Sequence, residues 1–483
     1  MKLIYEKSVK GRRGVKLPRP DVPAEDRVPG QYLRKSPPEL PEVSELDTVR
    51  HFTELSRKNF SVDTNFYPLG SCTMKYNPKI CEEAAGSAGF KELHPLLPQL
   101  RRGGMLTQGA LQIIYETERL LSEITGMAEF TMQPLAGAHG ELTAVMMIAA
   151  YHKARGGKRK KVIIPDSAHG TNPASAAIAG YDVASVPTGK DGVMDFEEFT
   201  KEIDGETAAV MLTCPNTLGL FNKDILRISA AAHTAGALMY YDGANLNAIL
   251  GKYRPADLGF DIMHINLHKT FAAPHGGGGP GAGPVGVGKE LVDYLPVSRV
   301  IMRDDGTCAL RYACADSIGY VAPFYGNMGV IIKAYVYILL LGREGLPRVA
   351  ENAVLNANYL MKKLKKFYEL PFDRTCMHEF VLSAQRQKAA GVTAMDIAKR
   401  MLDFGIHPPT VYFPLIVEEA LMVEPTETES LDTLDEFIAA MELIAGEAGE
   451  RPDFVRSAPH NMPVSRLDEV RAARQLDVGW KKE

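Results

Sequence analysis

Short apolar runs alternate with segments of helical periodicity through the middle of the chain. Runs rich in Val, Ile, Met and Tyr predict strands, and apolar residues spaced three and four apart predict the helices between them. Such alternation is typical of a mostly parallel sheet with helices on both faces. The predicted strands are 130–132, 161–165, 208–213, 238–242 and 262–266, and the predicted helices are 106–124, 142–154, 173–179 and 225–234.

The pattern changes after about residue 330. Two helical segments come first, and shorter strands and helices then alternate, which predicts a smaller C-terminal α+β domain. The predicted segments are helices at 329–341 and 348–368, a strand at 379–383, a helix at 394–404, a strand at 420–424, and helices at 432–445 and 466–476. We therefore expect four parts: an N-terminal arm with a partner-wrapping segment (1–90), a large domain (91–330), a small domain (331–450) and a tail (451–483).

Residues 1–45 are rich in Pro, Arg and Lys and show weak periodicity. They predict an extended arm with little core of its own. Two interpretations stay open, because such a segment either remains disordered or becomes ordered by wrapping around a partner subunit. The stretch 65–77 also lacks a clear period, yet it mixes aromatic, small and hydroxyl residues, which is typical of an ordered loop that carries function.

Composition narrows the class of protein. The 483 residues are 45% hydrophobic and 24% charged, with a net charge of -4, as expected of a globular protein for which nucleic acid is not the main partner. The longest apolar segment, 330–341, is too short to span a membrane, and the N-terminus lacks the pattern of a signal peptide. The six cysteines form no C-x-x-C pair, so no metal or disulfide framework is predicted, and a cytoplasmic location is the expectation.

One lysine stands out by its position. Lys269 follows the apolar run 262–265 and precedes the glycine-rich run 276–281. It therefore lies where a strand should end and an irregular backbone begins. Lysine loses its charge readily when it is desolvated, and the neutral amine forms Schiff bases with carbonyl compounds, including pyridoxal phosphate (PLP).

Polar residues also follow three other predicted strands. Ligands of parallel sheets bind beyond the carboxyl ends of the strands, where His169, the pair Thr213 and Asn216, and Asp242 are expected. Asp242, one strand–helix unit before Lys269, could cap a loop or could keep a PLP pyridine nitrogen protonated. His169 could bind its own loop backbone or stack on an aromatic cofactor.

The turn at 134–141 is rich in small residues and lies between a predicted strand and a helix. Two interpretations stay open: backbone N–H groups at a helix N-terminus that bind a phosphate, or a tight turn that permits close packing. Neither a Walker motif nor a dinucleotide fingerprint is present. No metal site is predicted at His264, His268 and His275, because no ligand spacing accompanies them.

Several motifs together give the chain a specific resemblance. It resembles the PLP-dependent glycine dehydrogenase (decarboxylating) family, the P-protein of the glycine cleavage system. Single-chain members hold two related halves, and this chain is similar to the lysine-bearing half, that is, to subunit 2 of the split prokaryotic form. The motifs are Pro68–Lys75, Gly137–Glu141, His169–Ala176, Asn266–Phe271, Pro274–His275 with the following glycines, and Leu421–Glu427.

The resemblance implies the α/β fold of type I PLP enzymes, which is aspartate aminotransferase-like, and it assigns roles to particular residues. Lys269 would bind PLP covalently and, with His169, would be catalytic. Asp242 would pair with the pyridine nitrogen, Ala244 would pack on the ring, and the loop 70–77 would approach the substrate. The implied cofactor-binding residues are Ala138, His139, His169, Thr213, Asn216, Asp242, Ala244, His268 and Lys269.

The resemblance further implies an oxidoreductase, the aminomethyl-transferring glycine dehydrogenase. It would decarboxylate glycine and transfer the aminomethyl group to the lipoyl arm of a carrier protein, within an α2β2 heterotetramer with subunit 1. Two alternatives stay open: another fold-type-I enzyme, such as an aminotransferase or amino-acid decarboxylase, and a non-catalytic scaffold subunit. The Asp242 and Lys269 pair argues against a scaffold.

Overall fold

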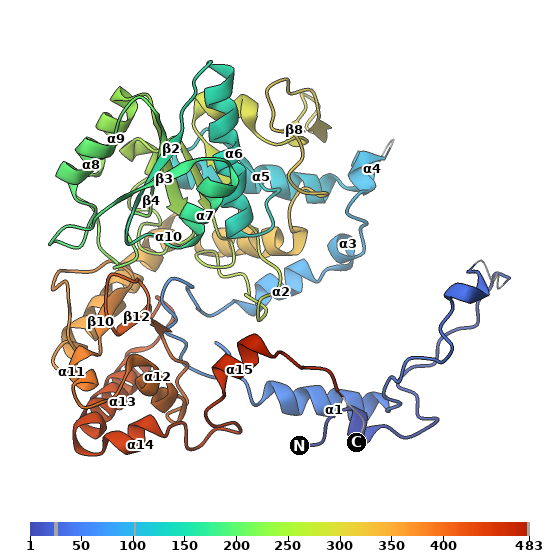
Figure 1. The fold of residues 1–483 in the computed structure, drawn as a ribbon. Helices are drawn as coiled ribbons and strands as arrows, with labels where there is room; N and C mark the ends of the chain where they lie inside the picture. The colour runs from blue at the N-terminus through green and yellow to red at the C-terminus, as the bar shows by residue number, and fades with distance from the viewer. Residues whose placement is uncertain (24–27, 101–102, 481–483) are drawn as a thin grey trace. The chain divides into compact units, whose positions relative to one another are not determined.

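A computed structural model describes residues 1–23, 28–100 and 103–480 (Figure 1). Its contacts divide the chain into two compact units, Met1–Thr64 and Asn65–Glu483, and each is described by itself. The boundaries expected at residues 90, 330 and 450 stay predictions. No helix in the described part of the chain is long and apolar enough to cross a membrane.

The first unit holds one long element, α1 (Glu45–Ser56), and two short 3-10 helices, η1 (Tyr5–Lys7) and η2 (Gly30–Tyr32). Helix α1 begins after Ser44, whose Oγ accepts a 3.1 Å hydrogen bond from the Asp47 amide. Among the described residues of this unit only Val43 and His51 are buried. The unit therefore has almost no core of its own, in keeping with the extended arm that the sequence predicts.

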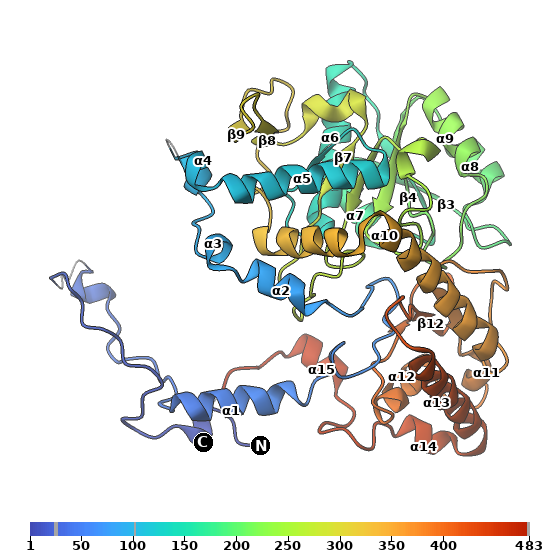
Figure 2. The same cartoon turned by 180° about the vertical axis from the view of Figure 1, so that it is seen from behind.

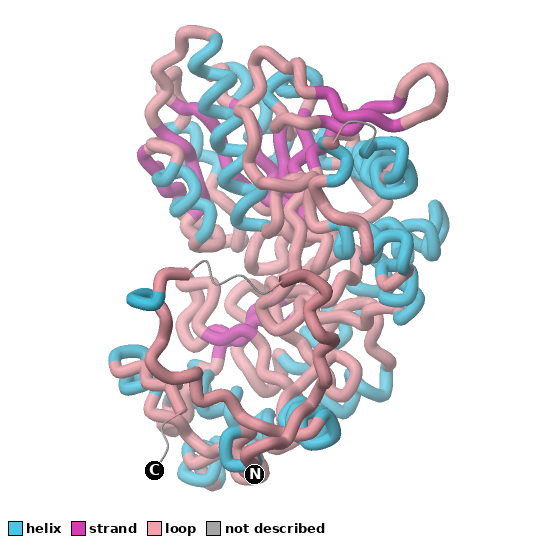
Figure 3. Tube along the Cα trace, turned by 90° about the vertical axis from the view of Figure 1, so that its right-hand side faces the viewer, coloured by secondary structure: helices cyan, strands magenta, loops and turns pink. Residues whose placement is uncertain are grey.

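The second unit is built on a seven-stranded sheet with the order β1-β7-β6-β5-β4-β2-β3. All neighbouring strands pair in parallel except at β7, which is antiparallel to both β6 and β1. This pairing confirms the predicted mostly parallel sheet. Figure 3 draws the strands in magenta and the helices in cyan. The strands are β1 (Glu129–Thr131), β2 (Lys161–Pro165), β3 (Asp182–Val186), β4 (Thr207–Leu212), β5 (Leu238–Gly243), β6 (Ile262–Ile265) and β7 (Val285–Val287).

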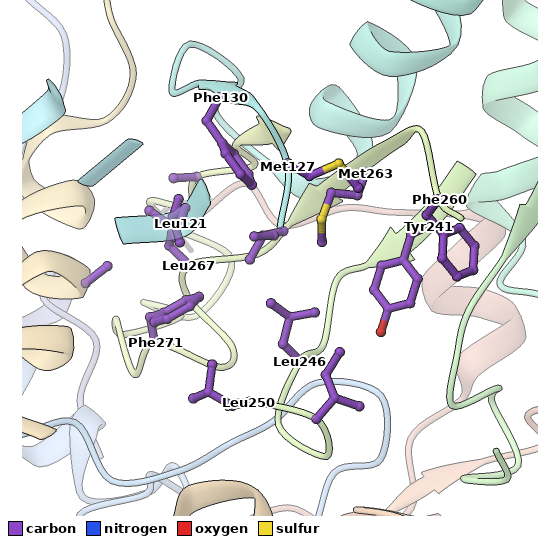
Figure 4. Packing of buried hydrophobic residues seen from close by; sticks show 14 of the residues in the cluster. Leu121, Met127, Phe130, Tyr241, Leu246, Leu250, Phe260, Met263, Leu267 and Phe271 are labelled. Atoms are coloured by element: carbon purple, nitrogen blue, oxygen red, sulfur yellow. The ribbon is translucent and has the colours of Figure 1, made fainter. Parts of the chain in front are cut away.

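Burial on both faces explains the continuous apolar strands at the centre. Every residue of β4 and β5 is buried, because helices cover both sides of the sheet. Successive side chains point to opposite faces, so Tyr241 belongs to one hydrophobic core and Tyr240 to the other. Figure 4 shows the first core, where Tyr241 packs edge-on against Phe260 with ring centroids 4.8 Å apart.

The helices of this region follow the predicted order. Helix α5 ends at Thr125 and is capped by Gly126, which adopts a left-handed φ of 76° that few other residues tolerate. Helix α6 begins at Gly137 rather than at the predicted 142, because the small residues of the turn form its first helical turn. The helices are α5 (Gln108–Thr125), α6 (Gly137–Ala154), α7 (Thr171–Ile178), α8 (Phe196–Glu202) and α9 (Ile225–Thr234).

A third hydrophobic core lies at the three-stranded antiparallel sheet β10-β12-β11. Helix α10 (Met328–Leu364) leads into it after packing beside α5 (Figure 2). The two helices predicted at 329–341 and 348–368 are the two parts of α10, which is interrupted at the non-helical Gly342. The other elements are β10 (Phe380–Ser383), α11 (Gln385–Lys388), α12 (Ala394–Leu402), β11 (Thr410–Val411), β12 (Ala420–Val423), α13 (Leu431–Glu450), α14 (Pro452–Arg456) and α15 (Glu469–Arg474).

Several short elements were not predicted. Strand β3 lies at an edge of the sheet and is mostly exposed, so its sequence carries no apolar run. Strand β7 is only three residues long. The other unpredicted elements are η1, η2, α1, α8, α11, β11, α14, α2 (Lys79–Ala85), α3 (Ala88–Lys91), η3 (Leu97–Gln99), α4 (Gly103–Leu106), η4 (Pro255–Leu258), η5 (Lys289–Tyr294), β8 (Arg299–Met302) and β9 (Cys308–Arg311).

Candidate active site

A cavity opens at the carboxyl ends of the central strands, as expected of a parallel sheet. It brings together residues from loops, helices and strands that are far apart in the sequence. Two predicted site residues, His139 and His268, do not line it. The predicted residues that line it are Ala138, His169, Thr213, Asn216, Asp242, Ala244 and Lys269.

Lys269 reaches the cavity from the segment after β6. Its Nζ donates a 2.6 Å hydrogen bond to the backbone carbonyl of Ser71, in the loop that the sequence singled out. Ser71 also lines the cavity, so one residue of the loop 70–77 lies at the candidate site, and approach of this loop to the substrate stays a prediction.

The same loop is fastened by two buried polar contacts. Lys75, whose side chain is 1% exposed, donates a 2.7 Å hydrogen bond to Glu427 Oε1. Thr73 Oγ1 donates a 2.7 Å bond to Glu424 Oε1. The motifs 68–75 and 421–427, which are separate in the sequence, therefore form one structure around the cavity.

Asp242 stands near the end of β5 and is 7% exposed. Its Oδ2 accepts a 2.9 Å hydrogen bond from Asn172, and its Oδ1 accepts a 3.1 Å bond from the Ala244 amide. His264 Nε2, on the adjacent strand β6, lies 3.5 Å from Oδ1. Burial alone would raise the pKa of Asp242, but His264, Asn172 and the Ala244 amide hold that pKa below its usual value, so the carboxylate is charged.

His264 is buried, and its second ring nitrogen contacts Tyr240 on strand β5. Its Nδ1 is hydrogen-bonded to the hydroxyl of Tyr240. Burial lowers the pKa of His264, so the ring is neutral at neutral pH. If the hydroxyl donates to Nδ1, the ring proton lies on Nε2 and faces Asp242.

A second carboxyl, Glu141, lies beside Asp242 and was not assigned a role from the sequence. The Asn172 side-chain nitrogen donates 2.9 Å bonds to both Glu141 Oε1 and Asp242 Oδ2. Burial, and then the negative charge of Asp242, raise the pKa of Glu141 to about 8. At neutral pH Glu141 is therefore protonated, and Asp242 carries the negative charge of this pair.

The other predicted residues differ in what they contact. His169 is exposed, and its ring centroid lies 5.4 Å from that of Phe413. The Asn216 side-chain amide is occupied within the protein, since its nitrogen donates to the Gly192 carbonyl in the loop after β3 and its oxygen accepts from the Leu218 and Leu220 amides of its own loop. His139 Nδ1 accepts a hydrogen bond from the Leu135 amide.

Both interpretations of the turn at 134–141 find support. A Cβ on Gly137 would lie 2.3 Å from Asn266 Oδ1, and one on Gly140 would lie 2.4 Å from the Gly283 carbonyl oxygen, so close packing requires glycine at both positions. Gly137 and Ala138 also line the cavity, and no side chain caps this end of α6. Its backbone N–H groups therefore remain suited to a phosphate.

PLP fits these residues. A charged carboxylate, a lysine amine and an uncapped helix N-terminus line one cavity, and each suits one group of the cofactor: the pyridine nitrogen, the aldehyde and the phosphate. Asn266 Oδ1, buried at the same cavity, accepts no hydrogen bond in the described structure, so it is available to a bound molecule.

His378, Glu379 and Glu424 form a further cluster that the sequence analysis missed. One ring nitrogen of His378 and one carboxylate oxygen of each glutamate lie within 4.8 Å of one another, and all three residues are buried. His378 and Glu379 line the cavity. Only strand pairing brings Glu379 and Glu424 together, so no local motif could have identified the cluster.

Comparison with known proteins agrees with this geometry. The chain is 56% identical over 480 residues to the probable glycine dehydrogenase (decarboxylating) subunit 2 of Thermotoga petrophila, covering 99% of each chain. It is 57% identical over 484 residues to the protein of the same name from Caldanaerobacter subterraneus, again covering 99% of each. The chain belongs to the glycine dehydrogenase (decarboxylating) subunit 2 family. Residues 349–461 match the family model of the glycine dehydrogenase C-terminal domain, and residues 135–278 match the family model of aminotransferase class-V.

Two solved structures of other proteins share the fold of this chain. A glycine decarboxylase (P-protein) of the glycine cleavage system, in inhibitor-bound form, matches with a TM-score of 0.71 and 21% identity, over 86% of this chain and 93% of that chain. A cysteine desulfurase from Thermococcus onnurineus matches with a TM-score of 0.62 and 16% identity, over 80% and 95%. The predicted fold class, type I of the PLP-dependent enzymes, is confirmed, and so is PLP as the cofactor.

Proposed function

We propose that this chain is the PLP-bearing subunit of a glycine dehydrogenase that decarboxylates glycine and transfers the aminomethyl group to the lipoyl arm of a carrier protein. One observation carries the proposal: Asp242 and Lys269 line a single cavity at the carboxyl ends of adjacent strands. The family's name supports it, since relatives covering 99% of this chain are named glycine dehydrogenase (decarboxylating) subunit 2.

We assign the predicted site residues roles in the proposed reaction. Bound PLP supplies an electron sink for the bond to the departing carboxylate. The Asp242 carboxylate keeps a proton on the pyridine nitrogen, and Lys269 attaches the cofactor and moves protons at the reacting carbon. The other proposed contacts are Ala244 and His169 on the two ring faces, Thr213 and Asn216 at the ring edge, and Ala138, His139 and His268 near the phosphate.

The charges around the cavity favour decarboxylation. Lys269 is the only lysine or arginine among the described residues that line it. An aminotransferase must hold its substrate's carboxylate throughout turnover, and a bidentate arginine suits that purpose. A carboxylate without such a partner is destabilised relative to the charge spread over the cofactor, so its loss is favoured.

The assembly and location are proposed on related grounds. The family name implies a subunit 1, and we propose an α2β2 assembly in which subunit 1 completes the active site or the surface that binds the carrier. The first unit of the chain, with few buried residues, is the segment proposed to wrap around that partner. All six cysteines are free, which supports a cytoplasmic location.

Exchange of labelled carbon dioxide into the carboxyl group of glycine tests the proposal. The chain with PLP, subunit 1 and lipoylated carrier should catalyse the exchange, and the chain without subunit 1 should be poorly active. Amino transfer to an oxo acid without exchange would favour an aminotransferase. Absence of both activities and of a PLP absorbance band would favour a scaffold subunit.

A further inference from the structure

Two carboxyl groups lie side by side on the wall of the cavity. Glu379 immediately precedes β10 and Glu424 immediately follows β12, and Phe380 pairs with Val423 in the antiparallel ladder between those strands. The register therefore places Glu379 opposite Glu424. Glu379 is 4% exposed and Glu424 is fully buried, and only Glu379 lines the cavity.

In the described part of the chain, neither carboxyl forms an ion pair with a lysine or arginine, although the nearby charge of Lys269 acts to lower the pKa of both. His378 Nε2 lies 3.7 Å from Glu379 Oε1, but burial lowers the pKa of His378 to about 3, so the ring is neutral. Burial of two adjacent carboxyls without an ion-pair partner outweighs the charge of Lys269, so the pKa of both stays above the usual value and the pair retains a proton.

The hydrogen bonds indicate which carboxyl holds it. Glu424 accepts bonds from the Thr73 amide, the Thr73 hydroxyl and the Asn245 side chain, all of which stabilise an anion. Glu379 Oε2 accepts one bond, at 2.8 Å, from the Ser71 amide. Burial, and then Glu424, hold the pKa of Glu379 well above its usual value, whereas the pKa of Glu424 is raised to about 7.

Ser71 places this acid close to the reacting centre. Its amide contacts Glu379, and its carbonyl accepts the hydrogen bond from the Lys269 amine, so both groups are held by one residue of the loop. Both also line the same cavity. A proton on Glu379 is therefore available to a molecule that reacts next to Lys269.

We propose that Glu379 is the general acid of the transfer step, with Glu424 as the carboxylate that shares its proton. The proposal rests on the proposed function, in which a cyclic disulfide is the acceptor. When carbon dioxide leaves, the electron pair left on the aminomethyl carbon forms a bond to one sulfur. The bond between the sulfurs breaks, and the second sulfur leaves with its electron pair and takes the proton from Glu379.

The step is balanced in electrons and protons. The carbon is oxidised by two electrons and the disulfide is reduced by the same two, so no further oxidant is needed. A thiol in water has a pKa of about 8.5, so an acid that is still protonated near neutral pH can protonate the leaving thiolate. Glu379 regains its proton from solvent after the product leaves.

The test uses the PLP-loaded complex with subunit 1 and lipoylated carrier. Glu379→Gln keeps an oxygen for the Ser71 amide but cannot release a proton. We expect PLP loading to be unchanged and the appearance of carrier thiol to slow by about a hundredfold or more. The exposed Glu418→Gln, in the loop before β12, is the matched control and should retain the wild-type rate.

Infrared spectroscopy measures the proton independently of activity. The protonated-carboxyl absorption at pH 7, to which Glu141 also contributes, should be stronger in wild type and in Glu418→Gln than in Glu379→Gln. Absence of that difference would overturn the proposal, as would a difference that appears only after EDTA, which would mean that the pair binds a divalent cation. If the wild-type complex transferred no aminomethyl group, the proposed function would fail, and the difference in absorption would still decide where the proton lies.

A second variant separates an acid from a merely structural residue. Glu424→Gln removes the negative charge that raises the pKa of Glu379. In a plot of transfer rate against pH, the fall in rate on the alkaline side should therefore occur at a pH lower by about one unit or more. A fall that stays at the wild-type pH in Glu424→Gln, or a wild-type transfer rate in Glu379→Gln, would contradict the assignment.

Discussion

The Lys269 amine donates a 2.6 Å hydrogen bond to the backbone carbonyl of Ser71, which lies 198 residues earlier in the chain. This contact joins the segment after β6 to the loop 70–77. The loop is itself fastened through Lys75 and Thr73 to the segment that follows β12. The position of the lysine amine thus depends on three segments that are distant in the sequence. Substitutions in any of these segments should therefore shift the amine within the site.

Asp242→Asn should reduce glycine decarboxylation by at least about a hundredfold, or roughly 2.7 kcal/mol of barrier. Asparagine can still accept the Ala244 amide but supplies no negative charge for a protonated pyridine nitrogen. PLP should still bind, as judged by its absorbance. The exposed Asp304→Asn is the control. Near-wild-type turnover in Asp242→Asn would rule out the role.

Glu141→Gln should change how stability depends on pH. The folded-state pKa of Glu141 is raised to about 8 from 4.5, so its stabilising contribution is complete below pH 4.5 and is lost as the pH rises through 8. Glutamine does not titrate. Wild type should therefore lose roughly 2 to 4 kcal/mol of unfolding free energy relative to Glu141→Gln between pH 5 and 8. Denaturant titrations at both pH values measure the difference, and parallel curves would show that Glu141 is charged throughout.

The elements that the sequence predicted correctly have a strong local signal. Strand β2 and helix α9 match their predicted bounds, because buried apolar side chains set a clear period in each. The exposed strand β3 and the three-residue β7 have no such period.

Some residues of the candidate site could be predicted from the sequence, and others could not. Lys269 and Asp242 could be predicted because each follows an apolar strand, and strand ends meet at one edge of a parallel sheet. Glu141, Glu379 and Glu424 could not, because their protonation depends on burial and on partners that only the folded chain brings near. Asn216 lies at the cavity as predicted, but its side-chain amide is hydrogen-bonded to its own loop and to the loop after β3.

Lys75→Met should destabilise the second unit by about 3 kcal/mol, because the buried Glu427 carboxylate loses its cation and keeps the hydrogen bonds from Asn247 and Tyr337. The methionine retains the apolar part of the side chain, so the loss reports the charge. Denaturation midpoints of the PLP-loaded chain measure it. Lys160→Met, at the exposed pair with Glu206, should leave the midpoint almost unchanged. Equal effects in the two variants would contradict the buried pair.

Deleting residues 1–40 should weaken association with subunit 1 while leaving the cavity intact. None of the described residues among 1–40 is buried, and the apolar side chains of Val15, Leu17 and Tyr32 are exposed, as expected of a segment that becomes ordered on a partner. Titration calorimetry with subunit 1 measures the affinity, and PLP absorbance is the control. Unchanged affinity would mean that residues 1–40 form a disordered tail.

The assignment of PLP to the Lys269 amine underlies all the other roles. Borohydride reduction of the PLP-loaded complex makes the cofactor–lysine bond permanent, and mass spectrometry of its peptides then locates the label. We predict a single labelled peptide that contains Lys269, and no covalent label in a folded Lys269→Ala chain. A label on any other lysine, or one that persists in Lys269→Ala, would contradict the assignment.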